Sequence, residues 1–490
     1  MSDSQTPGRI SAASASLWST LDLFGRQGIQ FIVSIILARL LLPEEFGVVA
    51  IVSFFIAVAA TLAQAGFAVA LIQNQQTTHD EENAVFWASL LLCTLLAAAL
   101  AAGAEPLARF YDEPELRWLL LAGAVIIFIS GFGAVPNALL TRELAFDRLL
   151  KLGLTATSVA AVCAVALAFS GFGPWALVAS AFTTTLISAI GIWFIHPWRP
   201  SLQINLASGR KLFGFGAWIG LSSLLDTAYT QGFSLLIGKL HGLAAVGLYN
   251  RGANTQQLPT GLLSAVIARV ALPIFSAHKG DVAAIGRGVK LSVGLTMFIN
   301  LPMMIGLAVT APMVIEVLFG PIWLPAAPVL SILALAGVLY PIHVITIQAI
   351  LALGQSALFF RLEIMKKLVA IACVVVGSFF GIVGLAWSQL AASILALLFT
   401  AYPAGRLIGF GWVAGTSELK NLGLPVLALV AVVYGTMWAL SDVNVFLRTG
   451  LVIGAGAMSF LAIAALTKNP QLAEAARLLR ELRSSRNVAA

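Results

Sequence analysis

Charge is the scarcest property of this chain. Of its 490 residues, 10% are Asp, Glu, Lys or Arg, whereas 60% are hydrophobic and the mean hydropathy is +0.96. A charged side chain is costly in hydrocarbon, and a chain with so few charges can keep nearly all of them in loops. The composition therefore excludes an ordinary soluble globular protein and predicts an all-α integral membrane protein.

The chain also lacks the usual signatures of metal, disulfide and nucleotide sites. Its three cysteines, Cys93, Cys163 and Cys373, stand in separate apolar stretches without CxxC spacing or a nearby histidine. No phosphate-binding loop of the GxxxxGKS or GxxxxGKT type occurs, so ATP is not an energy source through any visible site. We expect neither a metal nor a cofactor.

A cleavable signal peptide is missing from the first residues. Residues 1–16 are small and polar, without a basic region that leads into a short apolar core. We expect them to form a disordered cytoplasmic tail.

Long apolar runs are what the sequence has in abundance. About fourteen of them can each cross roughly 30 Å of hydrocarbon as a helix. They lie near residues 17–38, 46–72, 84–104, 117–140, 150–170, 174–195, 212–238, 244–270, 288–310, 325–351, 363–381, 384–404, 421–440 and 446–467. The connections are too short for a separate folded domain, so any function must lie between the helices.

The distribution of basic residues predicts the topology. With the N-terminus inside, 20 of the 28 Lys and Arg residues fall in cytoplasmic segments and five outside. This bias predicts that both termini are cytoplasmic. It also explains the net charge of +7 without nucleic acid as a partner. The basic, amphipathic tail at 468–490 could lie on anionic membrane lipid or could simply be solvated.

An internal repeat relates the first predicted span to the seventh. A shift of 200 residues superposes Ile35–Arg39 on Leu235–Lys239 and Gly47 on Gly247. Two sets of six spans that both begin inside favour parallel repeats about an axis along the membrane normal. The sequence thus predicts two six-helix lobes in pseudo-twofold repeat, at 17–211 and 212–404, followed by two C-terminal helices at 405–467.

The same shift places Arg26 opposite Asp226, each near the middle of its span. An ionised side chain at mid-bilayer costs about 2.5–3.5 kcal/mol on insertion scales, and is retained where it is paired, faces water or has a function. Both residues lie on polar helical stripes, which favours a water-filled cleft between the lobes. An intrahelical pair of Arg26 with Asp22, four residues earlier, remains an alternative.

The eighth span carries a second set of candidates. Arg251 and Arg269 are five helical turns apart and share one face with Asn254. These residues could contribute to the same cleft, or the two arginines could snorkel to lipid headgroups from the helix ends.

Eight sequence stretches, in this order and spacing, resemble one family of transporters. They are ARLLLPEEFG (38–47), FYDEPELRWLL (110–120), LLTRELAFDRL (139–149), GFGPWALV (171–178), WRPSLQI (198–204), RKLFGFGAW (210–218), IGKLHGLAAVGLYNRG (237–252) and LPIFSA (272–277). Across nearly the whole chain they resemble the Wzx-like polysaccharide exporters, especially the colanic-acid type. These exporters form a branch of the multidrug/oligosaccharidyl-lipid/polysaccharide (MOP) superfamily, which includes the MATE transporters.

The resemblance implies a fold, a substrate and partners. It implies two six-helix lobes around a central cavity, in the inner membrane of a bacterium. It implies flipping of undecaprenyl-pyrophosphate-linked oligosaccharide to the periplasmic leaflet for exopolysaccharide, capsule or lipopolysaccharide biosynthesis. A polysaccharide polymerase and co-export proteins are the implied partners. Related flippases line the cavity with arginines of the first and eighth helices, and Arg26 and Arg251 occupy those helices here.

Two other functions compete with this one. A membrane glycosyltransferase or polysaccharide polymerase needs carboxylates or a metal at a membrane surface, whereas the outer acidic cluster here sits in one short loop. We therefore expect no enzymatic activity. A cation-coupled multidrug exporter of the same superfamily would carry acidic coupling sites, yet apart from Asp22 and Asp226 the mid-span charges are basic. Basic residues suit an anionic pyrophosphate better.

Overall fold

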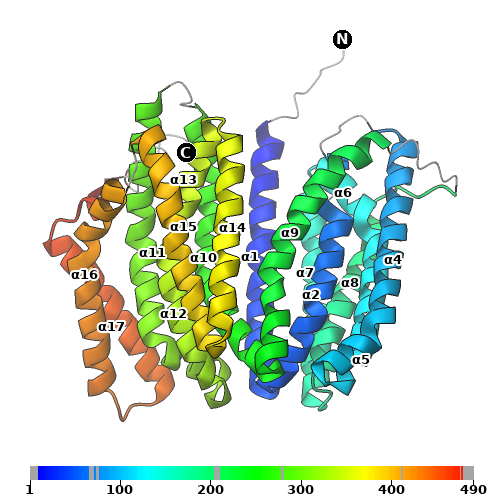
Figure 1. Cartoon of the computed structure of the whole chain (residues 1–490), viewed down its shortest axis with the longest axis horizontal. Helices are drawn as coiled ribbons and strands as arrows, with labels where there is room; N and C mark the ends of the chain where they lie inside the picture. Colours follow the sequence, from blue (N-terminus) through cyan, green and yellow to red (C-terminus); the bar gives the residue numbers. More distant parts are fainter. Residues whose placement is uncertain are drawn as a thin grey trace. The chain divides into compact units, whose positions relative to one another are not determined.

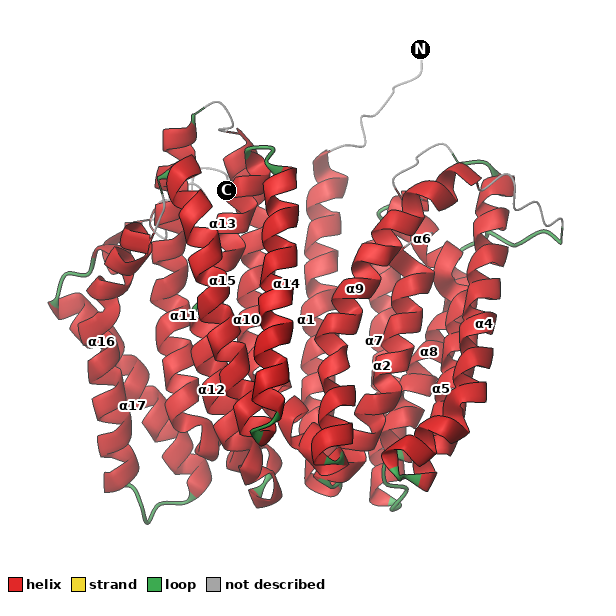
Figure 2. Ribbon diagram, viewed as in Figure 1, coloured by secondary structure: helices red, strands yellow, loops and turns green. Residues whose placement is uncertain are grey.

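The computed structural model describes residues 9–65, 71–72, 77–202, 210–277, 281–409, 412–474, 476–477 and 480. Within these residues every regular element is a helix, as Figure 2 shows. The prediction of an all-α membrane fold is confirmed.

The helices divide into two compact units, Met1–Gly247 and Leu248–Ala490. The elements of the first unit are α1 (Arg9–Leu40), α2 (Pro43–Ala65), α4 (His79–Tyr111), α5 (Pro114–Ser130), η1 (Gly131–Gly133), α6 (Ala134–Arg142), α7 (Phe146–Phe169), α8 (Trp175–Ile195) and α9 (Arg210–His241). Within this unit α1 packs on α7, α2 on α9, α4 on α5 and α7 on α8 (Figure 1).

The second unit begins inside α10 (Leu243–Ala277). Its other elements are α11 (Val282–Phe319), η3 (Pro321–Ala326), α12 (Ala327–Val338), α13 (Tyr340–Ala352), α14 (Ser356–Ser378), α15 (Gly381–Ile408), α16 (Trp412–Ala439) and α17 (Val445–Leu466). Here α11 packs on α12 and α16, α14 on α15, and α16 on α17.

Thirteen of the fourteen predicted spans coincide with described helices to within a few residues, and the remaining one, 46–72, begins in α2 and includes residues 66–70, which lie outside the described residues. Two of the spans, 117–140 and 325–351, are runs of consecutive helices: α5, η1 and α6 form the first, and η3, α12 and α13 form the second. Among the described residues, ten candidate spans are both long and apolar enough to cross a membrane. The count of fourteen crossings stays a prediction.

The ends of the chain differ in part from the sequence expectation. α1 begins at Arg9, so residues 9–16, predicted to be a disordered tail, already belong to this helix. The stretch is rich in alanine, which has the highest helix propensity, and can continue the helix that follows. Most of the predicted amphipathic tail at 468–490 lies outside the described residues, but Asn469 donates from Nδ2 to the carbonyl oxygen of Asn421 at 2.9 Å.

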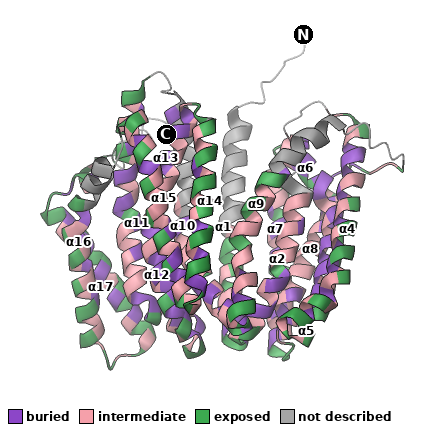
Figure 3. Ribbon diagram, viewed as in Figure 1, coloured by how far each residue is buried: buried purple, intermediate pink, exposed green. Residues whose placement is uncertain are grey.

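Apolar side chains cover the outer faces of the helices. Leu91 and Leu95 on α4 are 53% and 59% exposed, and Met458 on α17 is 67% exposed. Figure 3 shows such exposed positions along both helices. Exposed apolar faces of this extent are expected where the surrounding solvent is lipid.

A reciprocal contact joins the start of α2 to the first turn of α10. A Cβ atom on Gly47 would overlap the carbonyl oxygen of Leu243, and a Cβ atom on Gly247 would overlap that of Pro43. Each glycine is the fifth residue of its helix and meets the first residue of the other, as in a twofold-symmetric contact. The two glycines are also the pair that the 200-residue shift superposes.

The packing groups α9 with the first unit. The sequence placed this helix in the second lobe, which it predicted to begin at residue 212. Contacts of α9 with α2 explain the grouping, and the predicted lobe boundaries stay a prediction.

Candidate functional site

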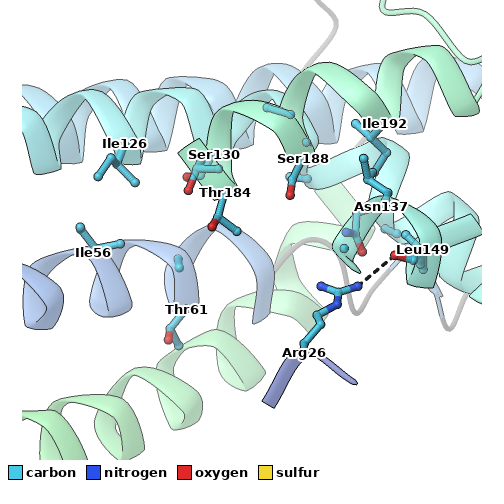
Figure 4. Close-up of a pocket in the computed structure, with 18 of the residues that line it drawn as sticks. Arg26, Ile56, Thr61, Ile126, Ser130, Asn137, Leu149, Thr184, Ser188 and Ile192 are labelled. Carbon is cyan, nitrogen blue, oxygen red and sulfur yellow. Dashed lines mark hydrogen bonds between the residues drawn. The ribbon is translucent and has the colours of Figure 1, made fainter. Parts of the chain in front are cut away.

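The first unit contains a cavity of about 920 Å³ that is lined by α1, α2, α5, η1, α6, α7, α8 and α9. Its polar lining consists of small hydroxyl and amide groups and two charged residues, and apolar residues such as Ile56 and Ile126 line one end of the view in Figure 4. The uncharged polar residues are Thr61, Ser130, Asn137, Thr184, Thr185, Ser188, Ser222, Ser223 and Thr227. The volume is in the upper part of the range typical of ligand-binding pockets.

Arg26 extends from α1 to the wall of this cavity. Its side chain is half-buried, and its Nη2 donates a hydrogen bond to the carbonyl oxygen of Leu149 on α7 at 3.0 Å. Figure 4 shows Arg26 and Asn137 directed into the cavity from α1 and α6. A guanidinium carries five N–H donors in a planar fork, and the bond to Leu149 fixes one end of that fork against α7.

Asp226 lines the same cavity from α9, and its side chain is exposed. Beside it, the hydroxyls of Thr227 and Thr61 hydrogen-bond at 2.9 Å and tie α9 to α2. The structure thus brings Arg26 and Asp226 into one cavity. Because one arginine and one aspartate are the charged lining residues among those described, the cavity is formally neutral. The sequence indicated that the mid-span charges are mostly basic. In the described lining of this cavity, the positive charge is that of Arg26.

A buried ion pair holds α6, one of the lining helices, against the start of α4. Arg142 at the end of α6 pairs through Nη2 with Oε1 of Glu82 at 3.0 Å, with 18% and 9% of the two side chains exposed. Thr77 accepts a hydrogen bond from Arg142 and donates one to Glu82 at 2.8 Å. A partly buried pair with these additional bonds keeps its polar groups satisfied and fixes α6 in place.

Arg251 lies in a different environment from Arg26. It belongs to the second unit and is 5% exposed. Its Cζ stands 4.6 Å from the ring centroid of Phe319 and 4.7 Å from that of Trp323. Stacking on two aromatic rings stabilises a desolvated guanidinium by up to about 2 kcal/mol per contact. This geometry favours a packing role, and Arg251 is not among the residues that line the described cavity.

Of the other predicted site residues, only Asn254 has a described side chain. Asn254 has an exposed side chain on α10 and does not line the cavity. The side chains of Asp22 and Arg269 lie outside the described residues, so the Asp22 alternative for Arg26 stays a prediction.

The structure adds residues that the sequence reading passed over. Thr184 and Ser188 are four residues apart in the apolar helix α8 and therefore share a face, a stripe that could have marked them. The carbonyl of Leu149 and the absent side chain of Gly153 have no such signal in a single sequence.

The fold and the cavity place this chain in the class of helical membrane proteins that have a polar, arginine-bearing cavity among their helices. The comparisons with known proteins define it further: a family described as "Polysaccharide biosynthesis protein" matches residues 36–328, and the chain belongs to this family. The predicted membership of the polysaccharide-exporter branch is confirmed.

One relative and two solved structures illustrate the similarity. The succinoglycan biosynthesis transport protein ExoT of Rhizobium meliloti (strain 1021) is 30% identical over 423 residues, which are 84% of this chain and 83% of the relative. The lipid II flippase MurJ in its inward closed conformation shares the fold with a TM-score of 0.72 at 16% identity, over 92% of this chain and 98% of that one. An inward-facing MATE transporter of the MOP superfamily has a TM-score of 0.60 at 18% identity, over 80% and 98%. The predicted MOP-type fold is confirmed.

Proposed function

We propose that this protein flips a lipid-linked oligosaccharide, carried on undecaprenyl pyrophosphate, from the cytoplasmic to the periplasmic leaflet. The glycan would serve exopolysaccharide, capsule or lipopolysaccharide biosynthesis. The observation that carries the proposal is the hydroxyl-lined cavity with Arg26 at its wall, in a chain that belongs to the polysaccharide biosynthesis family. ExoT, a succinoglycan transport protein by name, supports a glycan as the cargo.

The lining chemistry suits such a substrate. Hydroxyl and amide groups can both donate and accept hydrogen bonds, as sugar hydroxyls do, so a polar headgroup can exchange its water for these residues. The planar fork of Arg26 can bind two phosphate oxygens at once through charge-assisted bonds. Asp226 lowers the net charge of the cavity, so the substrate is held without becoming trapped.

Two competing functions are less well supported. A membrane glycosyltransferase or polymerase needs a constellation of acids or a metal site, and no metal-binding group of His, Cys, Asp and Glu occurs among the described residues. A cation-coupled multidrug exporter is favoured by one observation, Asp226 in the cavity. A single carboxylate that lines the same cavity as an arginine fits a coupling role within a glycan flippase equally well.

Reconstitution tests the proposal directly. Purified protein in liposomes should move a fluorescent polyprenyl-diphosphate oligosaccharide between leaflets, so that an added membrane-impermeant quencher reaches nearly all of it instead of about half. Liposomes without protein and a fluorescent phospholipid are the controls. Transport of a cationic drug with no movement of the glycolipid would favour the multidrug exporter.

The topology that accompanies this function can be tested separately. We expect both termini in the cytoplasm because the basic residues are concentrated in segments on that side. Reporters active only in the cytoplasm should be active when fused to either end, and reporters active only in the periplasm should be inactive. The reverse pattern at either terminus would contradict this topology.

A further inference from the structure

Gly153 lies where the guanidinium of Arg26 crosses α7. A Cβ atom built on Gly153 would overlap three atoms of that group, Cζ, Nη2 and Nε, because the guanidinium lies flat against the helix backbone at this residue. Leu149, whose carbonyl oxygen accepts from Nη2 at 3.0 Å, is one helical turn earlier on the same face. Arg26 therefore rests along one turn of α7.

The backbone of α7 does not itself need glycine at this position. Gly153 is inside a regular helix of 24 residues and is absent from the positive-φ positions of the described chain. Alanine is a better helix former than glycine in a helix interior. The contact that a larger residue would disturb is therefore the one with Arg26.

We propose that Gly153 is a positioning residue for Arg26, an inference that rests on the proposed role of Arg26 in binding the diphosphate. The missing side chain leaves the space in which the guanidinium lies. This space lets the group lie against the Leu149 carbonyl at the wall of the cavity. Any side chain at 153 displaces the guanidinium and misdirects its fork.

The central variant is Gly153→Ala, and the chain offers a matched control. Gly232 is inside α9 of the same unit but does not line the cavity, and a Cβ atom there would meet nothing within 4 Å, so Gly232→Ala adds the same methyl group without touching Arg26. Three properties are measured for each variant. They are the rate at which phenylglyoxal modifies Arg26, mapped by mass spectrometry, the affinity for farnesyl diphosphate, and the rate of glycolipid flipping in liposomes.

We expect Gly153→Ala to speed the modification of Arg26 severalfold and to weaken farnesyl diphosphate binding and flipping about tenfold, as for one lost charge-assisted hydrogen bond. Gly232→Ala should resemble the wild type in all three. Lysine carries a compact ammonium on a flexible stem, so Gly153→Ala should cause no further loss when Arg26→Lys is already present. The absence of a further loss would show that Gly153 acts by positioning Arg26 and not through a general effect on α7.

The rate of Arg26 modification distinguishes the positioning role of Gly153 from the diphosphate-binding role of Arg26. An unchanged rate in Gly153→Ala, or an equal loss of flipping in the Arg26→Lys background, would overturn the positioning role. A faster rate with unchanged farnesyl diphosphate binding and flipping would keep Gly153 as a partner of Arg26 but would overturn the binding role of Arg26. If Gly153→Ala does not fold, it is combined with Arg26→Ala, which vacates the space beside residue 153: recovered folding supports the contact, and continued failure to fold overturns the positioning role.

Discussion

Arg26→Ala is expected to lower glycolipid flipping about 10- to 100-fold, because hydrogen bonds to a charged group contribute about 1.5–3 kcal/mol. Insertion and thermal stability should change little, since the side chain is only half-buried and lies at a cavity wall. Flipping is measured in liposomes at matched protein density, and glycan export is measured in cells at matched expression. Full activity in Arg26→Ala would refute the phosphate-binding role.

Two further variants distinguish binding from simple pairing. Arg26→Lys keeps the charge but loses the planar fork, so flipping should be partly retained. If Arg26 instead only compensates Asp22, the double change Arg26→Ala with Asp22→Ala should restore activity, because neither charge then remains unpaired. We expect no such rescue, since the guanidinium already hydrogen-bonds to the Leu149 carbonyl on another helix.

The sequence was sufficient to predict the helical membrane fold and the family. It also predicted that Arg26 and Asp226 share a cleft between the two lobes; both residues line one cavity of the first unit, and the placement between lobes stays a prediction. These features follow from properties that are local in the sequence. The length of an apolar run determines whether it can cross the bilayer, and an isolated charge within such a run must face something other than lipid. The physical properties of each single helix were therefore enough to predict these features.

The sequence could not predict how particular side chains meet across helices. Arg251 and Arg26 look alike in the sequence, each an arginine within a predicted transmembrane span, yet Arg251 is stacked on Phe319 and Trp323. The rings come from residues about 70 positions further along the chain, at the end of α11 and in η3. Gly153 was passed over for a related reason, because its role depends on a side chain that approaches from α1.

The reciprocal glycine contact carries the second large expected effect. Gly47→Ala and Gly247→Ala should each destabilise the protein by about 1–3 kcal/mol or more, because the added methyl group meets a backbone carbonyl, which cannot rotate away as a side chain can. Gly454→Ala on α17 is the matched control, since a Cβ atom there meets nothing within 4 Å and alanine favours the helix. The losses of stability are measured by thermal unfolding in detergent, with size-exclusion chromatography to detect the fraction that remains folded.

The double variant distinguishes a single shared contact from two independent ones. Gly47 meets the residue that begins α10, and Gly247 meets the residue that begins α2, so one displacement of the two helix starts relieves both overlaps. The combined loss in Gly47→Ala with Gly247→Ala should therefore be clearly smaller than the sum of the single losses, as for coupled sites. Additive losses would show that the two glycines act separately. The repeat-related glycines would then not form one coupled contact between the starts of α2 and α10.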